Sequence, residues 1–171
     1  MKKEECFENY PAWIVFLANI VSLAIYLIGA LIIYKLGLVW LILYLVYILI
    51  LEFKLIGGHC RDCYYYGKTC AFGKGRVSAM FFKRGNLKNF CKMKLGWKNL
   101  IPDFLISLVP VIVGIILLII NFDWCLLLLV VVLIILASIG TSSVRSKLAC
   151  KYCKQRQLGC PAQKLFEKRK R

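Results

Sequence analysis

Nine cysteines are the most reactive side chains of this chain, and six of them follow one repeated spacing. The first copy is Cys60-x2-Cys63-x6-Cys70 and the second is Cys150-x2-Cys153-x6-Cys160, with a single cysteine, Cys6 or Cys91, before the apolar block that precedes each triad. The two thiolates of a Cys-x2-Cys pair can reach one metal ion from a tight turn. Structural zinc takes four such ligands in a tetrahedron. Four thiols per copy therefore predict a metal-ligand set.

We expect two four-thiol sites on this basis. One set contains Cys6, Cys60, Cys63 and Cys70, and the other contains Cys91, Cys150, Cys153 and Cys160. An alternative assigns Cys91 to the first triad, which is nearer in sequence, and His59 then completes one shell while Cys6 is left out. His59, the only histidine, also fits a hydrogen-bond donor behind the ligands or an ordinary solvent-facing residue. Zinc is the expected metal and an iron–sulfur cluster the alternative; without metal, the cysteines are small apolar residues or acylation sites.

The doubled spacing is similar to that of fungal binuclear zinc-cluster DNA-binding domains, in which six cysteines share two zinc ions. The similarity covers only the six triad positions, and the apolar block between the triads has no counterpart in that family. The resemblance implies that six thiols at this spacing can hold a shared metal cluster. The step Cys160-Pro161 also resembles the Cys-Pro ending of bacterial ferredoxin motifs, although the ferredoxin spacing itself is absent.

Two apolar blocks must position these cysteines. Of the 171 residues, 61% are hydrophobic, and the excess lies in residues 12–51 and 101–140. The interior of a soluble domain of this length is too small to bury so much apolar surface. A membrane-spanning helix needs about 20 residues, so each block accommodates two helices and a tight turn. The predicted helices are residues 13–34, 38–51, 103–120 and 124–139, which makes the chain an all-α membrane protein with four transmembrane helices. The second and fourth are short, and an extension through Glu52-Phe53 or Gly140-Thr141 is the alternative.

The basic residues predict which side of the membrane each segment occupies. Of 24 Lys and Arg, only Lys35 lies in a predicted hairpin turn; two precede the first helix, eleven fall in residues 52–102 and ten follow residue 140. This is the positive-inside distribution, which places both termini and the middle segment in the cytoplasm of a multi-pass cell-membrane protein. All cysteines except Cys125 then face a reducing compartment, where thiols bind metal or carry redox chemistry and do not form structural disulfides.

The same pattern divides the chain into two parallel repeats and a linker. Residues 1–75 hold the first hairpin and its cytoplasmic cysteine module. Residues 101–171 hold the second hairpin, its module and a basic tail, and both hairpins start and end on the same side. We therefore expect a pseudo-two-fold axis along the membrane normal.

The linker, residues 76–100, mixes basic and aromatic side chains. It is expected either to lie at the membrane interface or to form a short soluble helix packed on the cysteine module. Gly85-Asn86 and Gly96 would interrupt any helix there. Tyr64-Tyr65-Tyr66, directly after the first Cys-x2-Cys pair, is expected to seat the module at the level of the lipid headgroups, with ring stacking as the alternative.

Together these features predict a membrane-anchored protein with cysteine-ligated metal that serves as a scaffold or docking module, or as an electron-transfer module if the metal is an iron–sulfur cluster. The alternative is a metal transporter or metal-transfer protein, which the uncharged interior of the predicted helices does not favour. One histidine and eight acids do not favour an enzyme. The expected partners are membrane lipids with anionic headgroups and an unidentified protein. A homodimer is a further alternative. Topology accounts for the charge, so no nucleic-acid partner is expected.

Overall fold

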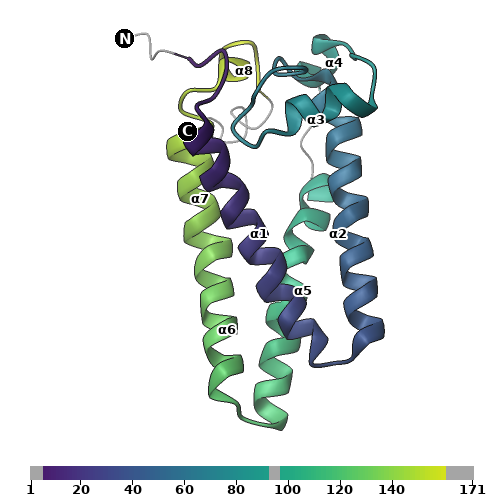
Figure 1. Cartoon of the computed structure of the whole chain (residues 1–171), viewed down its shortest axis with the longest axis vertical. Helices are drawn as coiled ribbons and strands as arrows, with labels where there is room; N and C mark the ends of the chain where they lie inside the picture. The colour runs from purple at the N-terminus through teal and green to yellow at the C-terminus, as the bar shows by residue number, and fades with distance from the viewer. Residues whose placement is uncertain (1–5, 93–96, 161–171) are drawn as a thin grey trace. The chain divides into compact units, whose positions relative to one another are not determined.

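A computed structural model describes residues 6–92 and 97–160 of the chain, most of them in helices (Figure 1). The long helices are α1 (Ala12–Tyr34), α2 (Leu38–Gly58), α5 (Trp97–Ile120) and α6 (Trp124–Ile135), and α6 continues through η2 (Leu136–Gly140), α7 (Thr141–Ser143) and η3 (Val144–Ala149). The short helices are η1 (Cys60–Asp62), α3 (Lys74–Phe81), α4 (Leu87–Lys92) and α8 (Lys154–Gln157). Four helices are long and apolar enough to cross a membrane, which confirms the predicted all-helical architecture at that level.

Three of these helices are longer than predicted, and one of them, α5, begins at Trp97 and not at residue 103. The helix α2 ends at Gly58 and not at residue 51, and the helical turns after α6 reach Ala149 and not residue 139. Charged side chains such as Glu52 and Lys54 have high helix propensity, so the end of an apolar run does not end a helix. The two glycines Gly57-Gly58, with low helix propensity, mark the end of α2.

The chain forms two compact units, each assembled from segments that are not consecutive in sequence. Unit 1 contains Met1–Ala18, Phe53–Trp97 and Val144–Arg171, whereas unit 2 contains Asn19–Glu52 and Lys98–Ser143. Unit 1 thus includes both cysteine triads and most of the linker, up to Trp97. Unit 2 includes most of the apolar helices.

Unit 2 is held together by apolar side chains that face its interior. Its buried clusters contain Ile25, Ile32, Leu126, Val130 and Leu133, and Ile33, Tyr44, Ile48, Leu51 and Ile106. Small residues allow close approach of the helices, because a Cβ atom at Gly114 would overlap the side chain of Val130. Many large apolar side chains on the other helix faces are exposed, as lipid contact requires.

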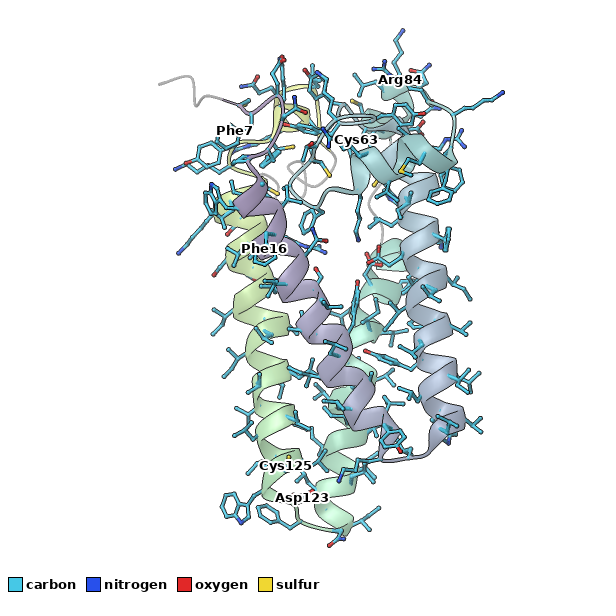
Figure 2. All side chains as sticks on the ribbon, viewed as in Figure 1. Phe7, Phe16, Cys63, Arg84, Asp123 and Cys125 are labelled. Carbon is cyan, nitrogen blue, oxygen red and sulfur yellow. The ribbon has the colours of Figure 1, made fainter. Side chains whose placement is uncertain are left out.

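The turns of the two hairpins meet at one end of unit 2. The first turn contains Gly37 in the left-handed region (φ 123°), which glycine adopts without steric cost. In the second, the carboxylate of Asp123 caps α6 by accepting a hydrogen bond from the N–H of Cys125 at 2.9 Å (Figure 2). Nζ of Lys35 lies 3.6 Å from Oδ2 of Asp123, which links the two turns.

Unit 1 contains short helices joined by loops. As predicted, Gly85-Asn86 interrupts the linker and separates α3 from α4. The N–H of Gly85 donates to the carbonyl oxygen of Arg61 at 3.0 Å, so the interruption packs against η1. The predicted interruption at Gly96 and the basic tail at residues 161–171 lie outside the described residues.

Candidate metal centre

Eight of the nine cysteines belong to unit 1, although four separate segments carry them. Cys6 precedes α1; Cys60, Cys63 and Cys70 follow α2; Cys91 belongs to α4; and Cys150, Cys153 and Cys160 follow η3. The exception is Cys125, which is exposed in α6 of unit 2 (Figure 2). None of the nine, all of them among the described residues, forms a disulfide. Folding therefore gathers every thiol that the spacing predicts as a ligand into one compact unit.

The first Cys-x2-Cys pair forms a tight turn at η1. The N–H of Cys63 donates to the carbonyl oxygen of Cys60 at 3.3 Å, and the N–H of Tyr66 donates to the carbonyl oxygen of Cys63 at 3.1 Å. The backbone at Cys63 is extended, with φ −80° and ψ 154°. The N–H of Tyr65 donates to the sulfur of Cys63. A backbone N–H that points at sulfur favours the thiolate, which is the form that binds metal.

The second pair repeats this turn position by position. The N–H of Cys153 donates to the carbonyl oxygen of Cys150 at 3.4 Å, and the N–H of Arg156 donates to the carbonyl oxygen of Cys153 at 3.1 Å. The backbone at Cys153 is again extended, with φ −81° and ψ 118°. Its sulfur accepts hydrogen bonds from the N–H groups of Gln155 and Arg156. The second cysteine of each pair is thus held by the same local geometry.

The two turns hold each other by reciprocal hydrogen bonds. The N–H of Tyr64, one residue after Cys63, donates to Oε1 of Gln155 at 2.8 Å. The N–H of Lys154, one residue after Cys153, donates to the hydroxyl oxygen of Tyr65 at 3.0 Å. In both bonds, the donor follows the second cysteine of one turn and the acceptor side chain lies two residues after the second cysteine of the other. We call this pair of bonds the clasp.

Gln155 connects the clasp to a third cysteine segment. Its side chain is buried, with 2% of its surface exposed. Oε1 lies 3.9 Å from the sulfur of Cys63, and Nε2 lies 3.8 Å from the sulfur of Cys91. The thiol of Cys91 also donates to the carbonyl oxygen of Leu158 at 3.3 Å. Cys91 therefore lies beside the loop between the second and third cysteines of the second triad.

The segment that carries Cys6 pairs with both turns. Phe7, the next residue, donates its N–H to the carbonyl oxygen of Tyr152 at 3.1 Å and forms an isolated parallel bridge with Cys153. The hydroxyl of Tyr65 donates to the carbonyl oxygen of Phe7 at 2.7 Å. The N-terminal segment thus contacts residues of both triads.

Burial disfavours the charged form of three thiols. It raises the pKa of Cys63 to about 12. The hydrogen bond from Tyr65 opposes this shift, and the neighbouring thiols of Cys153, Cys70 and Cys60 add to it. Burial likewise raises the pKa of Cys153 to about 11 and the pKa of Cys150 above its ordinary value. Without a cation, these thiols stay protonated at neutral pH.

Two buried polar atoms beside the first turn have no hydrogen-bond partner within the described part of the chain: Nδ1 of His59 and Oδ1 of Asp62. The carboxylate of Asp62 is paired electrostatically, because Nε of Arg61 lies 3.8 Å from Oδ1. Gly85 packs directly against this carboxylate, where a Cβ atom would overlap Oδ1. Among the described residues, no such partner is found for Nδ1 of His59, which directly precedes Cys60.

The thiols share one unit but do not converge on a common point. Across residues 6–92 and 97–160, no three His, Cys, Asp or Glu side chains are arranged to hold a metal ion. The structure therefore brings together the backbone turns of the two predicted ligand sets without assembling either set. The ligand sets and the choice of metal stay predictions.

The residues that join the turns were not predicted as functional. Tyr65 is buried, with 2% of its surface exposed, so the expectation that it lies among the lipid headgroups is wrong. Gln155 was not singled out at all. The common signal is position, since each lies two residues after a Cys-x2-Cys pair and the two copies can be aligned.

No protein-family model, curated protein sequence or solved structure matches this chain.

Proposed function

We propose that this chain is a multi-pass membrane protein whose unit 1 binds metal through cysteine thiolates on the cytoplasmic face. The metal, expected to be zinc, would fasten the segments that enter and leave the four spanning helices. The molecule would then serve as a membrane-anchored scaffold or docking module. The observation that carries this proposal is the clasp, in which two matched Cys-x2-Cys turns are locked together.

The order of the helices supports a single location for unit 1. If each of the four apolar helices crosses the bilayer once, the segments before the first, between the second and third, and after the fourth share one side. All the basic residues except Lys35 lie in or next to these segments. Lys35 and Asp123 mark the opposite end of the helices. This distribution supports the cytoplasm as the location of unit 1.

The matched turns support thiolate ligation. A Cys-x2-Cys turn presents two sulfurs on one side of a compact loop, and backbone N–H groups directed at sulfur tune the electron density of a bound thiolate. Burial raises the pKa of Cys63 and of Cys153, so a bound cation would have to displace their protons, because a coordinated thiol is deprotonated outright. Metal binding would require the sulfurs to rotate toward a common point while the turns keep their backbone.

The positions of the remaining candidates support a partition of the ligands. Cys91 lies next to Leu158, close in sequence to Cys160, which supports its assignment to the second triad. His59 adjoins Cys60, and its Nδ1 has no hydrogen-bond partner in the described part of the chain, which supports it as a further ligand or as a donor behind the first set. Cys6 adjoins Phe7, which contacts both turns, so these contacts are compatible with either set, and its assignment to the first set rests on the sequence.

The test is the metal content of the full-length protein purified without oxygen. We expect zinc, with Cys63→Ser and Cys153→Ser each lowering the bound amount and Cys125→Ser leaving it unchanged. Cys125 is the matched control because it is a free thiol of the same chain in unit 2. A visible sulfur-to-iron charge-transfer absorption with stoichiometric iron would replace zinc by an iron–sulfur cluster. Protein that folds with neither metal would refute the proposal.

A further inference from the structure

The helix α3 presents small residues to unit 1 and large apolar residues outward. Gly75 and Ser78 are buried, and a Cβ atom at Gly75 would overlap the carbonyl oxygen of Tyr65. Val77, Met80 and Phe81, at helical spacing i, i+3 and i+4, are 37%, 80% and 65% exposed. This arrangement is the reverse of an amphipathic helix packed on a soluble core.

These three side chains, the α3 stripe, are unusual within unit 1. Outside the four long helices, the exposed large apolar residues among the described parts of unit 1 are Val77, Met80, Phe81 and Leu158. Three of the four therefore form one continuous stripe on a single short helix. A concentrated apolar patch of this kind marks a surface that is covered by something else.

The helix α3 is fastened to the end of α2. The hydroxyl of Ser78 donates to the carbonyl oxygen of Ile56 at 3.1 Å, and Ser78 itself is fully buried. The ring of Phe82 packs on Gly57, where a Cβ atom would lie 3.0 Å from Cζ. Both contacts involve the last turn of α2, so the level of α3 is set by the end of a spanning helix.

The end of α2 lies just beyond the apolar part of the helix. The apolar run of α2 ends at Leu51, and at 1.5 Å per residue Ile56 lies about 7 Å further along the axis, within the headgroup layer that flanks a hydrocarbon core of about 30 Å. Because Ser78 bonds to Ile56, the α3 stripe lies near the level where acyl chains give way to headgroups.

The charges around α3 identify what covers the stripe. Residues 63–102 contain nine Lys or Arg and no Asp or Glu. Lys74 and Arg76 lie within α3, and Lys83 and Arg84 follow it, both exposed. Three side chains bury far less than the roughly 1,000 Å² that a specific protein–protein interface requires. Apolar residues bordered by basic ones at this depth instead match the boundary of an anionic lipid leaflet.

We propose that α3 is an interfacial helix whose stripe of Val77, Met80 and Phe81 inserts among the acyl chains of an anionic leaflet, with Lys83 and Arg84 on the headgroups. This contact would hold the cysteine turns against the membrane surface. The inference depends on α2 crossing the bilayer and not on metal binding.

The test is photo-crosslinking from α3 in the full-length protein. Benzoylphenylalanine replaces Met80 or, as a second reporter, Phe81, in vesicles of phosphatidylcholine with a minority of phosphatidylglycerol. The matched control replaces Ala79, an exposed position of the same helix outside the stripe. We expect lipid adducts from the reporters at positions 80 and 81 and none from the reporter at position 79. Folding is checked by circular dichroism, and the high exposure of Met80 makes the substitution compatible with the fold.

A second comparison tests the role of charge. The double variant Lys83→Ser with Arg84→Ser should lower lipid adducts at position 81 in anionic vesicles to the level found in pure phosphatidylcholine. Adducts to protein in place of lipid, whether to a second copy or to another chain, would overturn the proposal. Equal adducts at positions 79, 80 and 81 would overturn it as well, since they would show no preferred face.

Discussion

The hydroxyl of Tyr44 donates a hydrogen bond to the carbonyl oxygen of Ile106 at 2.8 Å, and this carbonyl is the one that Pro110 leaves without a helical partner. A proline inside a helix has no N–H, so the carbonyl four residues earlier loses its bond. Inside a bilayer no water can replace it. Tyr44 in α2 therefore satisfies a defect in α5.

Replacement of Tyr44 by Phe should lower the free energy of unfolding by about 1 kcal/mol, because it leaves the Ile106 carbonyl unsatisfied. Tyr47→Phe is the control. It removes a hydrogen bond to the Pro102 carbonyl, whose own helical hydrogen bond does not involve Pro110. Unfolding in mixed micelles measures both. In the Pro110→Ala background, which restores the N–H, the cost of Tyr44→Phe should shrink. An unchanged cost there would contradict this account.

Gly114→Ala should destabilise unit 2, because the new Cβ would overlap the side chain of Val130 on a neighbouring helix. Overpacking of this kind costs about 1–3 kcal/mol. Gly140→Ala is the matched change, since its Cβ meets nothing nearer than Val21 at 3.5 Å and should have little effect. Thermal unfolding in the same detergent ranks the two variants, and equal melting temperatures would argue against close packing at Gly114.

Gln155→Ala should loosen the clasp, because it leaves the N–H of Tyr64 without its acceptor. The loss of a partner to a buried donor costs about 1–3 kcal/mol. Gln157→Ala, on the same short helix but exposed, is the control. Hydrogen exchange at Tyr64 should accelerate in the first variant alone. If the two variants exchange alike, Gln155 does not join the turns.

The metal-free protein should lose stability as the pH rises above about 9. The ordinary pKa of cysteine is 9.0, whereas burial raises the pKa of Cys63 to about 12 and that of Cys153 to about 11. Between these values the unfolded chain has released protons that the folded chain still binds, so the free energy of unfolding falls. Below pH 9 both states are protonated and the stabilisation is complete.

Lysines and tyrosines titrate in the same range, so the informative quantity is the difference between variants. Cys63→Ser with Cys153→Ser should flatten the decline between pH 9 and pH 11, while Cys125→Ser should preserve it. Unfolding at several pH values in the presence of a chelator measures this. Identical slopes in all three proteins would show that the two thiols are not buried. Bound metal should remove the decline, because its ligands are already deprotonated.

The four apolar helices could be predicted from the sequence because hydrophobic runs near 20 residues have few other folded solutions. The break between α3 and α4 at Gly85-Asn86 could also be predicted, because it depends on the residue types at that position. The true ends of α2 and of the helix after α6 and the true start of α5 were missed, since an apolar run bounds the part inside a membrane and not the helix itself. Tyr65 was assigned to the headgroups by its residue type alone, whereas tertiary packing buries it.

By itself, the sequence determined the cysteine spacing, the apolar runs and the distribution of charge, all of which depend on residue type and local order. Only the tertiary structure decided that Gln155 and Tyr65 lock the two Cys-x2-Cys turns together, that Tyr44 satisfies the Ile106 carbonyl, and that α3 turns its apolar side outward. These relationships join residues far apart in sequence. They form because a buried donor or acceptor must find a partner wherever packing supplies one, and no local pattern specifies which partner that will be.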